Sequence, residues 1–130
     1  MITIALLKFL EDNNIGTIGE TLFWQNFDVD DYGLYIVNIG QAQARGSRRV
    51  QRYELYARSQ NDDKLGSLKL LESVIELINN SYNVCTLPGL PEEGVPSYGN
   101  VTLMPLGTPT RVGIDANGRV IWSTSGNIIY

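Results

Sequence analysis

The stretch from Pro109 to Tyr130 constrains the fold of this chain more than any other part of the sequence. Two β-rich runs flank Asn117-Gly118, and Asn-Gly between such runs is the strongest short-range signal of a β-hairpin. A type I′ turn needs positive φ at both central residues, which Asn and Gly accept most readily. We therefore predict a type I′ hairpin with Asp115 capping the turn. Because the second run reaches Tyr130, we expect this end of the chain to lie in a sheet.

The rest of the chain predicts runs of strands separated by two helices. Apolar residues recur at helical spacing over 2–13 and 65–80. Strands are expected at 21–27, 34–39, 50–58, 82–87 and 101–106, besides the C-terminal hairpin. Because strands follow one another instead of alternating with helices, we predict an α+β fold, with a largely antiparallel sheet and two main helices packed on one side. The 130 residues suffice for a single domain, 1–130.

Periodicity also assigns side chains to the predicted core. Alternate residues of 50–58 share a face of the strand, and the set assigned to the core is Gln51, Tyr53, Leu55 and Ala57. The second helix, with Asp62 or Asp63 as its N-cap, is expected to bury Leu65, Leu68, Leu71 or Glu72, Ile75 and Ile78. The mostly apolar stretch 34–39 suggests a strand covered on both faces. Loops are predicted at 41–49 and 88–100.

Composition excludes several classes of function. The chain has no histidine and a single cysteine, Cys85. Serine–histidine catalysis, cysteine–histidine catalysis and the commonest zinc sites are therefore excluded, and Cys85 is expected in the core. We expect no enzyme activity, no cofactor and no metal. A net charge of −4 argues against a nucleic-acid-binding surface over the whole protein. No apolar run approaches the ~20 residues that span a membrane, so we expect a soluble, globular protein.

The segment from Asp28 to Gly33 resembles the start of a calcium-binding loop. Asp28 and Asp30 occupy the first and third positions of such a loop, and Gly33 the sixth, with Asp31 between them. The twelfth position, where a bidentate glutamate is required, holds Ile39. A solvated acidic turn is the preferred interpretation, and a small domain that binds a divalent ion is the alternative.

Arginines concentrate at Arg45, Arg48, Arg49 and Arg52. One interpretation is a solvated loop, and another is a subunit contact, since arginine is favoured at interfaces. Nucleic-acid binding is less well supported, because no aromatic residues interleave with the cluster. The large aromatics Phe23, Trp24 and Trp122 are expected in the core, and any that is exposed becomes a candidate interface anchor.

The order of these motifs resembles the tail terminator family of long-tailed bacteriophages, whose members are also labelled minor capsid proteins. The matching features are an N-terminal helix (Ile2 to Asn13), Phe23-Trp24, Tyr53-Glu-Leu-Tyr56-Ala-Arg58, a helix from Leu65 to Asn80, a proline-rich loop (Pro88 to Pro96), Gly113-Ile-Asp115-Ala-Asn117-Gly118-Arg119, Trp122-Ser123 and Tyr130. The chain departs from the family at Ser123-Thr-Ser-Gly126-Asn, where Gly126 predicts an irregular last strand.

This resemblance implies a structural role without a reaction. Such a protein forms a homo-oligomeric, hexameric ring that caps the tail tube, ends tube polymerisation and offers a docking face to the neck or head-completion protein. It would be assembled in the host cytoplasm and would lie at the tail–neck junction of the virion, with DNA passing through it and no membrane involved. The alternative within the same assembly is a tail-tube or neck (head–tail connector) protein.

A ring built from one chain needs two different, complementary patches on each copy. Charge suggests the Arg45–Arg52 segment as one patch. The other is either the acidic turn Asp28, Asp30 and Asp31 or the pair Glu92 and Glu93.

Overall fold

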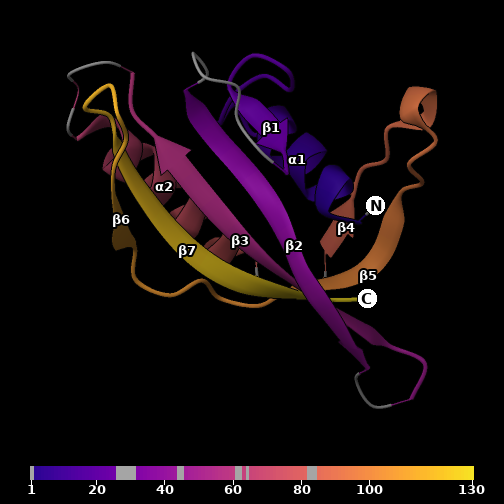
Figure 1. Ribbon diagram of the computed structural model, residues 1–130. Coiled ribbons are helices and arrows are strands. Elements are labelled where there is room, and N and C mark those ends of the chain that lie inside the picture. The colour runs from indigo at the N-terminus through magenta and orange to yellow at the C-terminus, as the bar shows by residue number, and fades with distance from the viewer. Residues whose placement is uncertain (1, 26–31, 44–45, 61–62, 64, 82–84) are drawn as a thin grey trace.

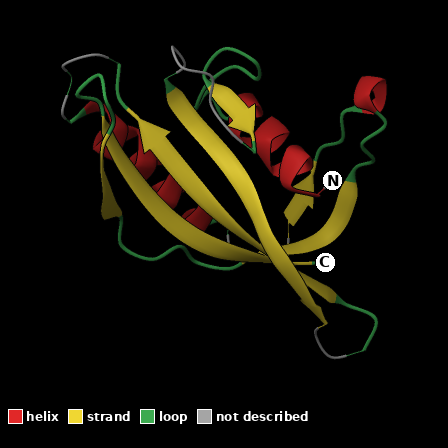
Figure 2. Cartoon of the chain, in the orientation of Figure 1, coloured by secondary structure: helices red, strands yellow, loops and turns green. Residues whose placement is uncertain are grey.

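In the computed structural model, a mostly antiparallel sheet of seven strands curls around two helices (Figure 1). Residues 2–25, 32–43, 46–60, 63, 65–81 and 85–130 are described. In chain order the elements are α1 (Ile2–Asp12), β1 (Leu22–Trp24), β2 (Gly33–Gln43), β3 (Arg49–Arg58), α2 (Gly66–Asn80), β4 (Cys85–Leu87), the 3-10 turn η1 (Pro91–Glu93), β5 (Tyr98–Leu103), β6 (Thr110–Ile114) and β7 (Val120–Ile129). The predicted α+β class is confirmed, and Figure 2 shows both helices on one side of the sheet. Five residues that carry predictions lie outside the described part of the chain: Asp28, Asp30, Asp31, Arg45 and Asp62.

The strands lie in the order β1-β2-β3-β7-β5-β4, and β6 pairs with the first part of β7. Only β1 and β2 pair in parallel; the other described strand pairs are antiparallel. The ladder between β2 and β3 runs from Gly33 opposite Arg58 to Gln43 opposite Arg49. The prediction of a loop over 41–49 was therefore wrong at both ends, because residues 41–43 belong to β2 and Arg49 belongs to β3. Glutamine and alanine have a low propensity for strands, but backbone pairing with β3 holds Gln41 and Ala42 in the ladder.

The core lies between the helices and one face of the sheet. On β3 the predicted set Gln51, Tyr53, Leu55 and Ala57 is buried. The prediction that 34–39 is covered on both faces was wrong: Leu34 and Ile36 are buried, whereas Tyr35 is only half-buried. The physical reason is that both helices pack on the same side. On the uncovered face Tyr35 stacks on Tyr56, with ring centroids 4.8 Å apart.

The first helix follows its predicted pattern. Ile2, Leu6, Leu7 and Leu10 form a buried stripe on α1, which is the arrangement that helical spacing of apolar residues produces. The helix ends at Asp12, close to the predicted end, and Asn14 adopts a positive φ of 62°.

The second helix buries Leu71 and Ile78 as predicted, but not the rest of the predicted set. Its buried residues are Ser67, Leu71, Val74 and Ile78, whereas Leu68 and Ile75 are only half-buried and Leu65 precedes the helix with 58% exposure. The Ser67 hydroxyl donates to the Val120 carbonyl at 3.1 Å, which fixes the start of α2 against β7. The prediction of Asp63 as the N-cap was wrong, because Leu65 occupies that position. Asp63 lies two residues earlier, and its Oδ1 accepts from the Gly66 N–H at 2.9 Å.

The C-terminal hairpin forms, but not with a type I′ turn. Of the turn residues only Gly118 has a positive φ, 78°. The Asp115 carbonyl accepts from the Gly118 N–H at 3.0 Å, and the Asp115 carboxylate accepts from the N–H groups of Asn117 (3.0 Å) and Arg119 (2.9 Å). The carboxylate thus organises a longer loop that ends in a left-handed glycine, a common alternative to type I′.

The last strand is regular and its end is tied into the sheet. β7 is continuous from Val120 to Ile129, so the irregularity predicted at Gly126 does not occur. Tyr130 exchanges two backbone hydrogen bonds with Arg49, of 2.7 and 2.9 Å, as expected of a terminal strand. The predicted loop 88–100 is more ordered than expected, because it contains η1 and the first residues of β5.

Candidate interaction surface at the arginine end

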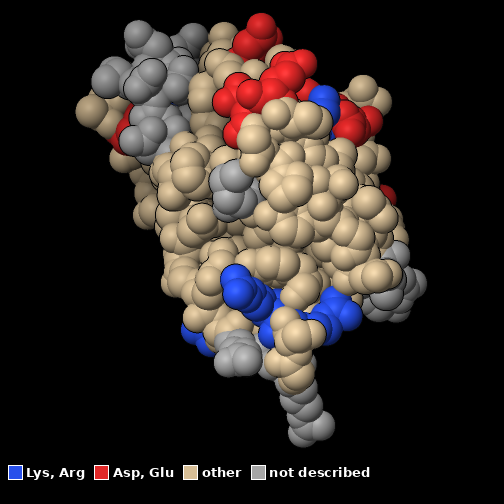
Figure 3. Space-filling model, turned by 90° about the vertical axis from the view of Figure 1, so that its right-hand side faces the viewer, with Lys and Arg blue, Asp and Glu red and all other residues tan. Residues whose placement is uncertain are grey.

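Three described arginines lie where β2 and β3 connect, and we call this region the arginine end. Arg48 immediately precedes β3, while Arg49 and Arg52 belong to it. Figure 3 shows basic side chains gathered toward one end of the face in view and acidic side chains at the opposite end. Arg45 lies outside the described residues.

Arg48 serves the fold more than the surface. Its Nη2 donates to the carbonyl oxygens of Asn100 (2.7 Å) and Ile129 (3.3 Å), and its Nε is buried. These contacts tie the hairpin to β5 and β7. Arg48, one of the predicted interface candidates, is thus already engaged within the chain, and a role for it in a subunit contact stays a prediction.

We expect Arg48→Ala to lower the free energy of unfolding by about 1–2 kcal/mol, because it leaves two carbonyl groups without a charged donor. Arg52→Ala is the matched control. Arg52 is exposed on the same strand, and a surface substitution of this kind usually stays within about 0.5 kcal/mol. Urea denaturation of the two variants measures the difference. Equal stabilities would contradict the structural role of Arg48.

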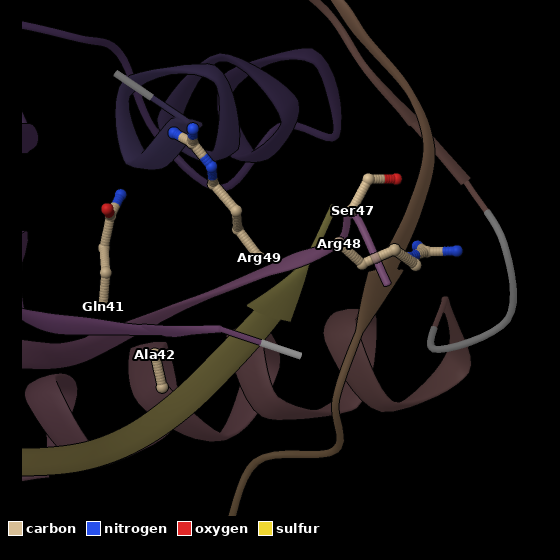
Figure 4. A pocket seen from close by; sticks show the side chains of 5 residues that line it. All are labelled: Gln41, Ala42, Ser47, Arg48 and Arg49. Carbon is tan, nitrogen blue, oxygen red and sulfur yellow. The ribbon is translucent and has the colours of Figure 1, made fainter. Parts of the chain in front are cut away.

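A polar pocket of about 470 Å³ opens beside these arginines, lined by Gln41, Ala42, Ser47, Arg48 and Arg49. In Figure 4, Gln41 and Arg49 extend to the same side of the hairpin, while Arg48 turns toward β5. The Arg49 side chain is exposed and makes no hydrogen bond or ion pair with other described residues. Its guanidinium is free to bind an anion from outside the chain. We call this hollow the arginine pocket.

One wall of the arginine pocket is held in place by side-chain hydrogen bonds. Gln41 Nε2 donates to Gln51 Oε1 at 2.9 Å and to the Tyr130 hydroxyl at 3.1 Å. Gln51 is buried, and its own Nε2 donates to the carbonyl groups of Gly40 and Arg52. Gln41 and Ser47 were not identified from the sequence, because glutamine and serine in a predicted loop carry no distinguishing signal.

The acidic pair Glu92 and Glu93 lies in a compact loop, which we call the acidic knob (residues 90–95). Leu90 and Val95 exchange backbone hydrogen bonds of 2.9 and 3.0 Å across its base, and Val95 is 1% exposed. The Gly94 N–H donates to the Pro91 carbonyl at 3.1 Å, and this hydrogen bond closes the 3-10 turn. Both glutamates are exposed, and neither makes an ion pair with a described residue. The knob presents two carboxylates on a fixed backbone.

The predicted charged patches do not meet within one copy. Figure 1 places η1 at the top right and the connected ends of β2 and β3 at the bottom right, well apart from one another. The second acidic candidate, Asp28, Asp30 and Asp31, lies outside the described residues. Any pairing of the arginine pocket with the acidic knob therefore requires another molecule.

The turn residues Asp115, Asn117 and Gly118 have the structural role predicted for them. Arg119 Nε donates to Asp115 Oδ2 at 2.8 Å, and Arg58 lies 3.7 Å from the same oxygen. Desolvation acts to raise the pKa of Asp115, but hydrogen bonds from Arg119 and Asn117 outweigh it and hold the pKa below its usual value. The carboxylate that shapes the turn is thus charged near neutral pH.

The large aromatics are less buried than predicted. Trp24 is 43% exposed, although its Nε1 donates to Thr3 Oγ1 at 3.1 Å, so it becomes a candidate interface anchor. Phe23 and Trp122 are half-buried, and Trp122 packs against the core. Cys85 also packs against the core, and burial raises the pKa of its thiol.

Two further kinds of site were sought in the part of the chain that the structure describes. No group of three or more His, Cys, Asp or Glu side chains there could hold a metal ion. None of the described helices has the length and apolar character needed to cross a membrane.

No protein-family model matches the chain, and no curated protein matches it.

Proposed function

We propose that this protein is a structural component of a bacteriophage tail. In this role it forms a ring of six copies that caps the tail tube, ends its polymerisation and offers a face to the neck. The proposal involves no reaction and no cofactor. Its partners are other copies of the chain, the tail-tube protein and the neck or head-completion protein.

The observation that best supports a ring is the separation of charge. The Arg49 guanidinium lies near the connected ends of β2 and β3, and the Glu92 and Glu93 carboxylates lie on η1, which Figure 1 shows well apart from that region. None of the three side chains has an ion-pair partner among the described residues. A ring of identical copies needs two different, complementary patches on each copy, and these two regions meet that requirement. The motif order that resembles tail terminators lends independent support.

Net charge agrees with a channel through which DNA passes without binding. Six copies of a chain with net charge −4 would carry 6 × −4 = −24, which repels a polyanion at long range. Arginines engaged in subunit contacts would not retard the DNA.

A tail-tube or neck protein of the same assembly is the second candidate. The outer edges of β4 and β6 have no strand partner in the part of the chain that the structure describes, and free strand edges can add further subunits. The divalent-ion domain depends on Asp28, Asp30 and Asp31, so no described group favours it.

We expect the purified protein to form rings with a central hole in negative-stain micrographs. When added in small amounts to its tail-tube protein, identified by the neighbouring tail genes, it should shorten the tubes by occupying their growing ends. Open tubes formed by the protein alone would support the tube alternative. Compact monomers that leave tube length unchanged would contradict a role in ending polymerisation.

A further inference from the structure

We propose that the arginine pocket of one copy receives the acidic knob of the next copy. The Arg49 guanidinium would bind the carboxylates of Glu92 and Glu93, with the Ser47 hydroxyl as a further donor. This inference rests on the ring proposed above and assigns the two surfaces that join its subunits.

Both surfaces are formed before they meet. The knob is closed by the two hydrogen bonds between Leu90 and Val95 and is anchored by buried Val95. The pocket wall is fixed by the hydrogen bonds of Gln41 to Gln51 and Tyr130. Among the described residues of the two surfaces, association therefore has little backbone to order, and preorganised partners lose less free energy on binding.

Charge identifies a second copy of this chain as the occupant. The pocket offers a guanidinium without a described partner, whose planar donors match a carboxylate in two-pronged geometry. The same chain supplies two exposed carboxylates without described ion-pair partners on η1, which Figure 1 places apart from the arginine end. Because each copy carries one pocket and one knob, each contact leaves a further pocket and knob open, which is the heterologous pattern that closes into rings.

Nucleic acid is the less suitable occupant. Aromatic side chains, on which bases would stack, are missing from the described lining of the pocket. Of the three arginines, Arg48 is already engaged by backbone carbonyl groups. A phosphate ligand remains an outcome that the experiment can detect.

The test is a charge exchange between the two surfaces. We expect Arg49→Glu alone, and Glu92→Lys with Glu93→Lys, each to weaken self-association about tenfold or more, since each leaves like charges facing one another. An equimolar mixture of the two variants should assemble again, because each pocket then meets a knob of opposite charge. Sedimentation velocity over a wide concentration range, at low and moderate salt, measures the association.

The controls make the same charge changes elsewhere. Arg52→Glu alters an exposed residue of the same strand outside the pocket lining, and Glu72→Lys with Glu76→Lys alters the exposed side of α2. Both should assemble like the wild type. At a concentration low enough to keep every protein monomeric, all variants should unfold at the wild-type temperature, since every substituted side chain is exposed.

Three results would overturn the inference. The first is a wild-type chain that stays monomeric at every concentration. The second is a pair of variants that assembles no better mixed than separate. The third is unchanged assembly of Arg49→Glu together with lost binding of a single-stranded oligonucleotide, which would identify the pocket as a phosphate site. If wild-type rings persist and cap tubes while the exchange has no effect, the proposed function stands and this interface is wrong.

Discussion

Leu71→Ala and Ile78→Ala should each lower the free energy of unfolding by about 2–5 kcal/mol, the usual cost of truncating a buried aliphatic side chain. Both side chains are fully buried on the core face of α2. Leu65→Ala is the matched control, because Leu65 is 58% exposed and immediately precedes the helix; its cost should stay within about 0.5 kcal/mol. Denaturant melts compare the three variants.

This comparison also tests the corrected helix face. Helical periodicity in the sequence selects Leu68 and Ile75, for which we would have expected the same large loss. The structure leaves both side chains half-buried, so their truncation should cost less than that of Leu71 or Ile78. A larger loss at Leu68 than at Leu71 would show that α2 is rotated relative to the sheet.

Gly126→Ala should lower the free energy of unfolding by about 1–3 kcal/mol or more, the range found when an atom is forced into a filled core. A Cβ at this position would lie 2.7 Å from the Tyr53 hydroxyl oxygen and 2.8 Å from its Cζ, and would also collide with Leu106. Tyr53 is fully buried and Leu106 nearly so, which leaves neither free to move away. Thermal and urea unfolding measure the loss.

The variant Tyr53→Phe tests how much of the Gly126→Ala loss comes from crowding against the Tyr53 hydroxyl. The Tyr53 hydroxyl is buried without a hydrogen-bond partner, and burial raises the pKa of Tyr53 well above its ordinary value. Removing an unsatisfied buried hydroxyl should be neutral or stabilising. In the double variant it should recover part of the Gly126→Ala loss, because the contact with Leu106 remains. If the Gly126→Ala protein is as stable as the wild type, the core around Gly126 can rearrange to accommodate the added methyl group.

The element order and the inward face of β3 could be predicted because their signals are local. Strict alternation from Gln51 to Ala57 fixes which side chains meet the helices once one face of the sheet is covered. The face of α2 could not be predicted in the same way. A polar residue, Ser67, occupies the buried stripe because it bonds to the Val120 carbonyl of a strand more than fifty residues away, and periodicity of apolar residues cannot detect such a partner.

The candidate site was predictable only in part. The arginine cluster and the pair Glu92 and Glu93 are visible in the sequence as charge. The distinction between Arg48 and Arg49 is not, because it depends on whether the carbonyl of Asn100 lies within reach. The same holds for the pocket, which exists only because β2 continues to Gln43 and brings Gln41 opposite Gln51.

The position of β7 has a consequence for how the sheet is completed during synthesis. β3 and β7 pair along almost their whole length, from Val50 opposite Ile129 to Arg58 opposite Ile121. When β3 leaves the ribosome, the hairpin with β2 can form, but the other edge of β3 stays open until β7 has been translated. Contacts so distant in sequence close slowly, and an open edge bearing Tyr53 and Leu55 can pair with the wrong chain. We expect the arginines beside this hairpin to keep nascent copies apart during that interval, since like charges at a strand edge oppose mispairing.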